Sequence, residues 1–209
     1  MKVLIACEES QAITIQLRLI GIDAFSCDIQ ECSGGFPEFH IQGDCVKEAY
    51  SGKYDAMIAH PPCTYLAVSG ARWLYNKDGS RNKDRFTKQK EALDFVRLLM
   101  NAPIKRIAIE NPVSVISSQI RKPDQIINPF QFGHPEQKKT CLWLKNFPLL
   151  EETNNVYNYM MTLPKRERTR IHWLGSNKSK ERSKTYKGIA KAIADQWFIN
   201  VNEYQLSLF

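Results

Sequence analysis

The chain has 209 residues, 43% of them hydrophobic and 24% charged, which is the composition of an ordinary globular protein long enough to bury a sizeable core. No apolar run approaches the roughly 20 residues needed to span a bilayer, and the N-terminal stretch "MKVLIACEES" is too short for an export signal. We therefore expect a cytoplasmic protein with no membrane partner, and the net charge of +7 favours an anionic one.

Strand and helix patterns alternate along the chain. Short apolar runs predict strands, and helical periodicity predicts helices, of which the first has Ser10 as a possible cap. The predicted strands are 2–6, 22–28, 54–60, 104–110 and 140–144, and the predicted helices are 9–20, 86–100 and 188–198. This alternation predicts an α/β fold with a parallel sheet, in a single domain over residues 1–209.

Chemically useful side chains follow several of the predicted strands. In a parallel α/β sheet the ligand site lies outside the carboxyl ends of the strands, so these residues are expected to share one edge. They are Glu8, Asp28, Asp44, Pro62, Cys63 and Glu110. Asp28 stands 21 positions after Cys7, close to the spacing expected for a ribose-binding acid, whereas Asp44 can equally be a turn residue.

Cys63 lies in "IAHPPCTYLAVSG", residues 58–70, directly after two prolines. A reduced cysteine is often only a small hydrophobic residue. However, proline fixes its own φ and restricts the residue before it, so two prolines at a strand end fix the direction of the next side chain. A thiol mounted in this way beside an acid has the minimum parts for covalent catalysis.

Glu110, in "AIENP", is the candidate acid, because it is expected directly after a buried strand. The simpler interpretation is a helix cap or a surface glutamate. A partly desolvated carboxyl at the sheet edge is expected to have a raised pKa and to donate a proton near neutral pH.

The six cysteines contain no CxxC pair and are expected to be reduced thiols. Three cysteines and one histidine are of the types that bind zinc, but their spacings match no common zinc module, so we predict no metal. They are Cys27, Cys32, His40 and Cys45.

The positive charge is local. Residues 165–187 hold nine lysines and arginines against two glutamates, so this strip accounts for the whole net charge. A charge run is commonly a solvated face, but cations interleaved with an aromatic residue are also typical of nucleic-acid binding. The candidate contacts in the strip are Trp173, Lys178, Lys180, Arg182 and Lys184.

Several motifs resemble those of the DNA cytosine carbon-5 methyltransferase family, and they occur in the family's order. "AHPPCTYLAVSG" is similar to its nucleophile motif, and "AIENP" is similar to its Glu-Asn-Val motif. "FGHPEQKKTCLWL" follows the outline of its Gln-x-Arg-x-Arg segment, and "YKGIAKAIADQW" resembles its closing helix. The resemblance implies a Rossmann-like fold that binds S-adenosylmethionine, with a mostly parallel sheet and helices on both faces.

The resemblance also implies roles for individual residues. Cys63 would add to carbon-6 of cytosine while Glu110 engages the ring nitrogen, and S-adenosylmethionine would supply the methyl group. Asp28 would hold the ribose, Asp44 the adenine amino group, and Pro62 would pack near the reactive end. DNA would be bound as a duplex with the target cytosine flipped out. The loop 64–85, which carries Arg72, would close over it.

The sequence departs from the family in three places. The first-strand glycine motif reads "IACEES", so cofactor binding near Glu8 differs in detail. The Gln-x-Arg-x-Arg positions read Glu136, Lys138 and Thr140, of which only Lys138 can contact the nucleic acid as a cation. A short basic insertion, 145–185, stands where family members carry a target-recognition domain, so we expect low sequence specificity and a monomer or weak oligomer.

Two alternatives stay open from the sequence. The missing glycines and arginines fit a nucleic-acid-binding protein on a decayed methyltransferase scaffold. The missing recognition domain fits the same chemistry on RNA or on a free cytidine nucleotide. Amino-group methylation is disfavoured, because those enzymes have an aromatic residue after the two prolines, where this chain has Cys63.

Overall fold

Seven strands form one sheet in the order β3-β2-β1-β4-β5-β7-β6 in the computed structural model, which describes residues 1–175 and 178–199. Strands β1 to β5 are mutually parallel, and β7 is antiparallel to both of its neighbours. The strands are β1 (Lys2–Ala6), β2 (Asp23–Asp28), β3 (His40–Gln42), β4 (Ala56–Ala59), β5 (Arg106–Pro112), β6 (Gln125–Ile127) and β7 (Thr140–Lys145). The strand order reverses between β1 and β4, which is where an open α/β sheet places its ligand crevice.

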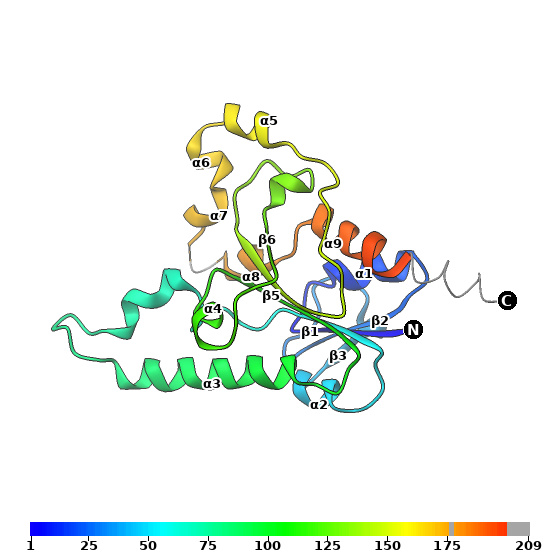
Figure 1. The fold of residues 1–209 in the computed structure, drawn as a ribbon, viewed down its shortest axis with the longest axis horizontal. Coiled ribbons are helices and arrows are strands. Elements are labelled where there is room, and N and C mark those ends of the chain that lie inside the picture. Colours follow the sequence, from blue (N-terminus) through cyan, green and yellow to red (C-terminus); the bar gives the residue numbers. More distant parts are fainter. Residues whose placement is uncertain (176–177, 200–209) are drawn as a thin grey trace.

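Helices cover both faces of this sheet (Figure 1). Helices α1 (Ala12–Leu19) and α9 (Lys187–Ala194) pack against each other and on one face, whereas α2 (Cys45–Ala49) and α3 (Lys83–Met100) lie on the other. Two hydrophobic clusters result, one on each side of strands that are buried almost throughout. The predicted α/β fold, with a mostly parallel sheet and helices on both faces, is confirmed.

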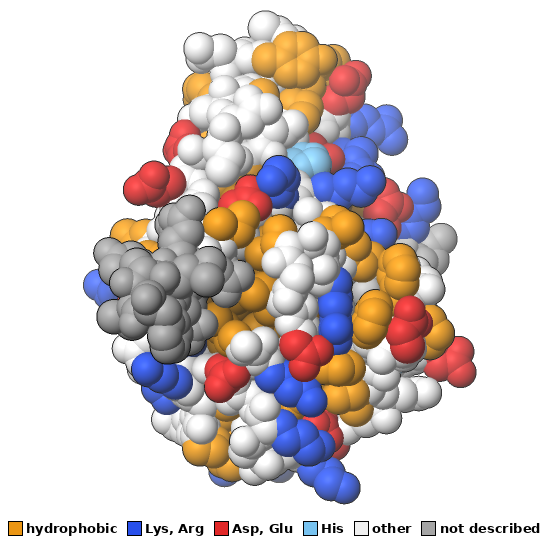
Figure 2. Space-filling model, turned by 90° about the vertical axis from the view of Figure 1, so that its right-hand side faces the viewer, with side chains coloured by type: hydrophobic (Ala, Val, Ile, Leu, Met, Phe, Trp, Pro, Cys, Tyr) orange, Lys and Arg blue, Asp and Glu red, His pale blue; other side chains and the backbone are white. Residues whose placement is uncertain are grey.

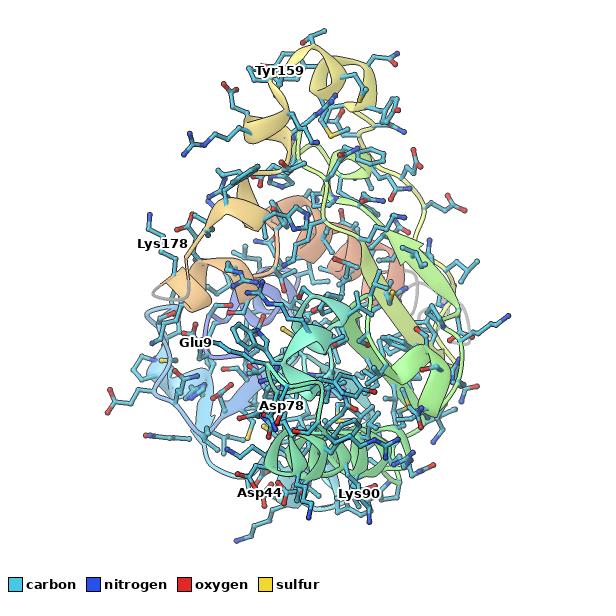
Figure 3. The ribbon with its side chains drawn as sticks, turned by 90° about the vertical axis from the view of Figure 1, so that its left-hand side faces the viewer. Glu9, Asp44, Asp78, Lys90, Tyr159 and Lys178 are labelled. Atoms are coloured by element: carbon cyan, nitrogen blue, oxygen red, sulfur yellow. The ribbon has the colours of Figure 1, made fainter. Side chains whose placement is uncertain are left out.

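The remaining elements are short. They are α4 (Ile116–Gln119), α5 (Tyr157–Thr162), α6 (Lys165–Arg168), α7 (Arg170–Trp173), α8 (Ser179–Ser183), 3-10 turns at Pro37–Phe39, Val68–Leu74 and Pro129–Gln131, and a π-helical turn at Asp195–Ile199. Figures 1 and 3 both place α5 to α7 at the end of the molecule opposite α3. Within the described residues, no helix has the length and apolar character needed to cross a membrane.

Two differences from the predicted boundaries affect the candidate site. Helix α1 begins at Ala12 rather than at residue 9, and Ser10 does not cap it. Strand β5 continues through Glu110 to Pro112, because antiparallel β7 pairs with it over this stretch. The short strands β3 and β6 were not predicted, since three residues are too few to show a periodic pattern.

Candidate active site

The loop that carries Cys63 is fixed at its start by the sheet. Strand β4 is fully buried, and the next backbone amide, that of His60, donates to the Ala6 carbonyl of β1 at 2.9 Å. Pro61 is buried, whereas Pro62 and Cys63 are exposed. The Cys63 carbonyl then accepts from the amides of Leu66 and Ala67, which closes a tight turn. Cys63 is thus presented to solvent from a stiff backbone, as expected from the two prolines.

A second set of hydrogen bonds ties this loop to β5. The buried Asn111 side chain donates to the Pro61 carbonyl at 2.7 Å. Further along, the Val68 amide donates to the Val113 carbonyl, and the Val115 amide donates to the Leu66 carbonyl. The segment with the thiol and the segment with Glu110 therefore hold each other in place.

Glu110 forms an ion pair with His60, whose Nδ1 lies 2.8 Å from Oε2 of the carboxylate. The His60 side chain is 11% exposed and that of Glu110 is 20% exposed. Burial raises the pKa of Glu110, but the hydrogen bond and charge of His60, together with the charge of Lys138, outweigh it, so that the pKa is lowered overall. The expectation of a raised pKa at Glu110 was therefore wrong, because it took account of burial and not of the partner, His60.

The pKa of His60 shifts in the opposite direction. Burial disfavours the imidazolium, but the hydrogen bond and charge of Glu110, and the charge of Glu8, raise the pKa above its ordinary value. His60 and Glu110 thus favour the charged form of each other. Nε2 of His60 is buried without a hydrogen-bond partner among the described residues, and the side chain lines a cavity of about 20 Å³ together with Glu110, Lys138 and Tyr186.

The thiol of Cys63 lies within electrostatic reach of the same carboxylate. Its pKa is raised, first by partial removal from water and second by the negative charge of Glu110, while the positive charges of Lys138 and Arg182 act against this. Chemically active groups from separate parts of the chain therefore gather at one edge of the sheet. The raised pKa favours the protonated thiol over the thiolate.

Two acids at the carboxyl ends of β1 and β2 form the neighbouring part of this edge. Asp28 ends β2, is half-buried, and accepts a hydrogen bond from the Gln30 amide; its pKa is raised, chiefly by burial. Glu9 has a buried carboxylate oxygen, Oε2, with no hydrogen-bond partner among the described residues. A buried acceptor without a donor is costly unless a ligand satisfies it.

Glu8 has a different environment from its neighbour. Its carboxylate is buried and accepts hydrogen bonds from the Ile13 amide at 2.7 Å and from both the amide and the hydroxyl of Thr14. These bonds satisfy the first amides of α1, which the side chain of Gln11 at the N-cap position does not cap. Glu8 therefore fixes the β1–α1 turn, and any contribution to ligand binding is through the shape of that turn.

The backbone of the turn has a special conformation. Cys7 and Gln11 both have positive φ, 59° and 55°, a left-handed backbone conformation that is uncommon for residues other than glycine. The Gln11 side chain makes two hydrogen bonds with the backbone of Phe36, so that the loop after β2 packs against the turn. Gly34 permits this contact, because a Cβ there would lie 2.5 Å from Cβ of Gln11.

Asp44, which was also predicted to bind the cofactor, follows β3 in the sequence. It is exposed, and its Oδ1 accepts from the amides of Val46 and Lys47, which caps the short helix α2. It therefore has the structural role of a cap, and its second oxygen is not used in these bonds.

The thiols near this edge form a hydrogen-bonded group. The Cys7 amide donates to Sγ of Cys45, which in turn donates to the Cys27 carbonyl. His40 instead contacts the Ser26 hydroxyl and the Gln30 carbonyl. No group of three or more His, Cys, Asp or Glu side chains is placed to hold a metal ion in the part of the chain that the structure describes.

The basic strip begins beside the site and leads away from it. Nζ of Lys138 donates to the Arg182 carbonyl at 2.9 Å, and Arg170 binds Glu136 and Glu181. Trp173 is 62% exposed, and all the other predicted contacts of the strip are exposed as well, namely Lys178, Lys180, Arg182 and Lys184. In the projection of Figure 3, Glu9 lies between Lys178 and the segment that carries Asp78. By contrast, charges of both signs are interspersed on the face drawn in Figure 2.

Sequence reasoning missed three residues of the site. His60 and Asn111 lie within the motifs "AHPPCTYLAVSG" and "AIENP" but were given no role, and Glu9 follows Glu8. His60 directly follows a buried apolar strand, so its polar ring was expected to be partly buried. A buried polar group needs a hydrogen-bonding or charged partner, and this was the available sequence signal.

The chain was compared with known proteins. It is similar to the solved structure of an E. coli prophage product described as a putative DNA modification methyltransferase, with 13% identity, 69% of this chain and 46% of that chain covered, and a TM-score of 0.42. It is also similar to the S. pombe Dnmt2 methyltransferase, with 15% identity, 80% of this chain and 56% of that chain covered, and a TM-score of 0.46. A third similar structure is the Entamoeba histolytica methyltransferase EhMeth, with 18% identity, 74% of this chain and 57% of that chain covered, and a TM-score of 0.48. The chain thus spans about half the length of these structures. No family model and no curated protein matches it.

Proposed function

We propose that this protein is an S-adenosylmethionine-dependent methyltransferase that acts on carbon-5 of cytosine in DNA through a covalent adduct with Cys63. The observation that carries the proposal is that the loop with Cys63 and the strand with Glu110 are hydrogen-bonded to each other at one sheet edge, where the negative charge of Glu110 acts on the thiol. Hydrogen bonds from Asn111 and between the two loops hold this arrangement. The resemblance of the two motifs to those of the cytosine carbon-5 family assigns the reaction.

The proposed chemistry requires opposite proton states at the two groups. The thiolate of Cys63 adds to carbon-6, and the pair of electrons displaced from the ring makes carbon-5 nucleophilic. Glu110 binds the ring nitrogen, where negative charge develops, and delivers a proton or a strong hydrogen bond to it. After transfer of the methyl group, water takes the carbon-5 proton as the thiolate is expelled, and the ring nitrogen returns its proton to Glu110, which restores the ring and the enzyme. Neutralising Glu110 also removes one of the two effects that raise the pKa of Cys63.

S-adenosylmethionine fits the residues at the ends of β1 and β2, and when bound it supplies the methyl group from its sulfonium. Glu9 offers a buried acceptor for a hydroxyl or amino group, and half-buried Asp28 offers a carboxylate for a ribose diol. Ile29, 79% exposed beside Asp28, presents an apolar surface on which a planar base can pack. Pro62, exposed and directly before Cys63, is assigned to the reactive end. Calorimetry is expected to show binding that is weakened by Asp28→Asn and by Glu9→Gln.

The basic strip, residues 165–187, is proposed to bind the phosphates of DNA. It overlaps the segment 145–185, which is proposed to be a short insertion in place of a recognition domain. The charge of Arg182, within the strip, acts to lower the pKa of Cys63, which indicates that this part of the strip lies near the thiol, so DNA bound along the strip would bring a flipped cytosine near Cys63. Phosphate contacts position a protein without reading sequence, and low sequence specificity follows.

The test is a nucleoside assay. DNA is incubated with the protein and S-adenosylmethionine, digested, and analysed for 5-methylcytosine by mass spectrometry. Cys63→Ala is expected to abolish product and the covalent trapping of 5-fluorocytosine DNA, whereas the control Cys32→Ala, at another partly accessible thiol, is expected to retain both. Duplex, single-stranded DNA, RNA and cytidine nucleotide are compared in parallel. No product on any of them from folded, cofactor-binding protein would contradict the proposal.

A second candidate is nucleic-acid binding on a scaffold that has lost its cofactor site. The engagement of Glu8 with α1 favours it, because that carboxylate is not free to bind a ligand. It predicts salt-dependent DNA binding without any heat of S-adenosylmethionine binding, and a measurable heat eliminates it.

A further inference from the structure

An open groove of about 540 Å³ lies outside the site described above. It is formed by the segment 65–88, which we call the arm and which comprises the 3-10 turn Val68–Leu74, a loop and the first residues of α3. In Figure 1 the arm extends to the left, beyond the rest of the molecule. The residues of the groove that matter here are Tyr65, Trp73, Tyr75, Lys77, Arg85 and Lys88.

The arm is built as a formed structure rather than as an open loop. The Asn82 amide donates to the Leu74 carbonyl at 2.9 Å, and the Asn76 amide donates to the Ser80 carbonyl at 2.8 Å. Tyr75 and Arg81 form an antiparallel bridge, and the ring of Tyr75 packs edge-on against Phe86. The groove therefore exists before any ligand arrives, which reduces the ordering cost of binding.

The groove combines exposed aromatic rings with positive charge. Trp73 is 54% exposed and Tyr75 is 52% exposed, and the guanidinium of Arg72 lies 4.5 Å from the Trp73 ring centroid. Lys77, Arg85 and Lys88 line the groove together with one acid, Asp84, so positive charge is in excess. Exposed aromatic faces among cations are the combination that binds single-stranded nucleic acid, because rings stack on bases while cations hold phosphates.

The groove adjoins the candidate nucleophile along the chain and in space. Nη2 of Arg85 donates to the carbonyl of Thr64, the residue directly after Cys63, at 3.0 Å. The same guanidinium lies 5.1 Å from the centroid of Tyr65, which lines the groove. When a cytosine of a nucleic-acid strand reaches Cys63, the nucleotides next to that cytosine are therefore close to the groove.

We propose that the groove of the arm binds unpaired nucleotides of single-stranded DNA, with a base stacked on Trp73 and the neighbouring phosphates on Lys77 and Lys88. Bases within a duplex have their faces covered by their neighbours, so only an unpaired base can stack on the ring. The proposal rests on the proposed function for the identity of the strand as DNA. If the groove binds unpaired nucleotides, the preferred substrate is a cytosine that is flanked by unpaired nucleotides.

The test uses tryptophan fluorescence, because the exposed tryptophans differ in place. Trp143 and Trp197 are buried, whereas Trp73 lies in the groove and Trp173 on the basic strip. A cytosine-containing DNA 12-mer is expected to quench the tryptophan fluorescence of the full-length protein, and Trp73→Leu is expected to remove the part of the quenching that arises in the groove and to weaken binding roughly five- to 150-fold. Because Trp173 belongs to the basic strip, the control is Tyr50→Leu, at an exposed ring outside both the groove and the strip, which is expected to keep the quenching and the affinity. Binding of Trp73→Leu equal to that of the unmodified protein would overturn the proposal.

A charge pair gives an independent readout. Lys88→Glu is expected to reduce the salt dependence of binding, by roughly 0.7 in the log–log slope for each phosphate that the protein no longer binds. Lys90→Glu, on the same helix but outside the groove, is expected to leave the slope closer to that of the unmodified protein (Figure 3). Equal changes in the two variants would show only a general charge effect and would overturn the assignment of Lys88.

Two further oligonucleotides separate the bases from the phosphates and DNA from RNA. An abasic 12-mer is expected to bind more weakly and without quenching, and a duplex is expected to quench less than the single strand. Equal binding of the abasic strand, or a preference for the RNA strand, would overturn the proposal. None of these measurements uses cofactor or turnover. If DNA quenches the fluorescence of the protein but is not methylated by it, the proposed function alone is refuted. If DNA is methylated but does not quench the fluorescence, the proposal for the groove alone is refuted.

Discussion

The pair formed by His60 and Glu110 predicts a stability that depends on pH in a defined window. A hydrogen bond to a charged group contributes about 1.5–3 kcal/mol, and both side chains are less than a third exposed, so solvent screening is limited. We expect His60→Ala to lower the free energy of unfolding by about that amount at pH 6. His60→Asn, whose amide can stand near the position of Nδ1, is expected to lose about half as much, because it keeps a bond without the charge.

The sign of the pH dependence follows from the two pKa shifts. The pKa of His60 is raised, so its contribution is complete below the ordinary value of 6.5 and is lost as pH rises through the folded-state pKa. The pKa of Glu110 is lowered, so its contribution is complete above the ordinary value of 4.5 and is lost as pH falls through the folded-state pKa. The pair is therefore strongest between pH 4.5 and 6.5.

Urea unfolding of the unmodified protein and of His60→Asn, at pH values from about 5.5 to 9, measures this directly. The difference in free energy of unfolding is expected to be largest at the acidic end of this range and to shrink as pH rises, with the denaturant slope unchanged. A difference that stays constant across the range would refute the ion pair, because a purely steric effect of the substitution does not titrate.

Three further substitutions test the framework of the site. Asn111→Leu leaves the Pro61 carbonyl without its buried donor, and we expect a loss of about 1–3 kcal/mol in urea unfolding; a loss below about 0.5 kcal/mol would show that this bond does not hold the loop. Gly188→Ala places a Cβ onto the Phe132 carbonyl oxygen, so the thermal midpoint is expected to fall by about 2–4 °C for each kcal/mol of strain, and an unchanged midpoint would contradict this packing. Cys63→Ala is expected to change the free energy of unfolding by no more than about 0.5 kcal/mol, because the side chain is exposed; a larger loss would indicate a role in packing.

The sequence predicted the longer elements of the fold because their patterns repeat. Helix α3 shows its apolar face over eighteen residues, and β1 is a continuous apolar run bounded by polar residues. The direction of β7 was not predictable, since an apolar run does not encode the direction in which a strand enters the sheet. This mattered for the site, because pairing with β7 keeps Glu110 inside a strand with a fixed side-chain direction.

The site was predictable in its positions and not in its electrostatics. The rule that ligands bind at the carboxyl ends of strands places Asp28, Cys63 and Glu110 at one edge from strand assignments alone. The charge state of Glu110 depends on His60, fifty residues earlier, and the capping role of Glu8 depends on where α1 begins. Such pairings are set by tertiary contacts within a few ångström, which one sequence does not record.

The electrostatics of the site bear on how the proposed reaction can start. The raised pKa of His60 and the lowered pKa of Glu110 favour the charged forms of this pair, and the charge of Glu110 helps to raise the pKa of Cys63, which favours the proton on the thiol. Transfer of that proton to Glu110 leaves the net charge of the three groups unchanged while producing both the nucleophile and the acid. A buried site resists a change in net charge more than a redistribution of charge. His60 opposes this transfer by stabilising the carboxylate, so a ring nitrogen that accepts a proton from Glu110 is needed to complete it, and the thiolate is then formed only when the base is in place.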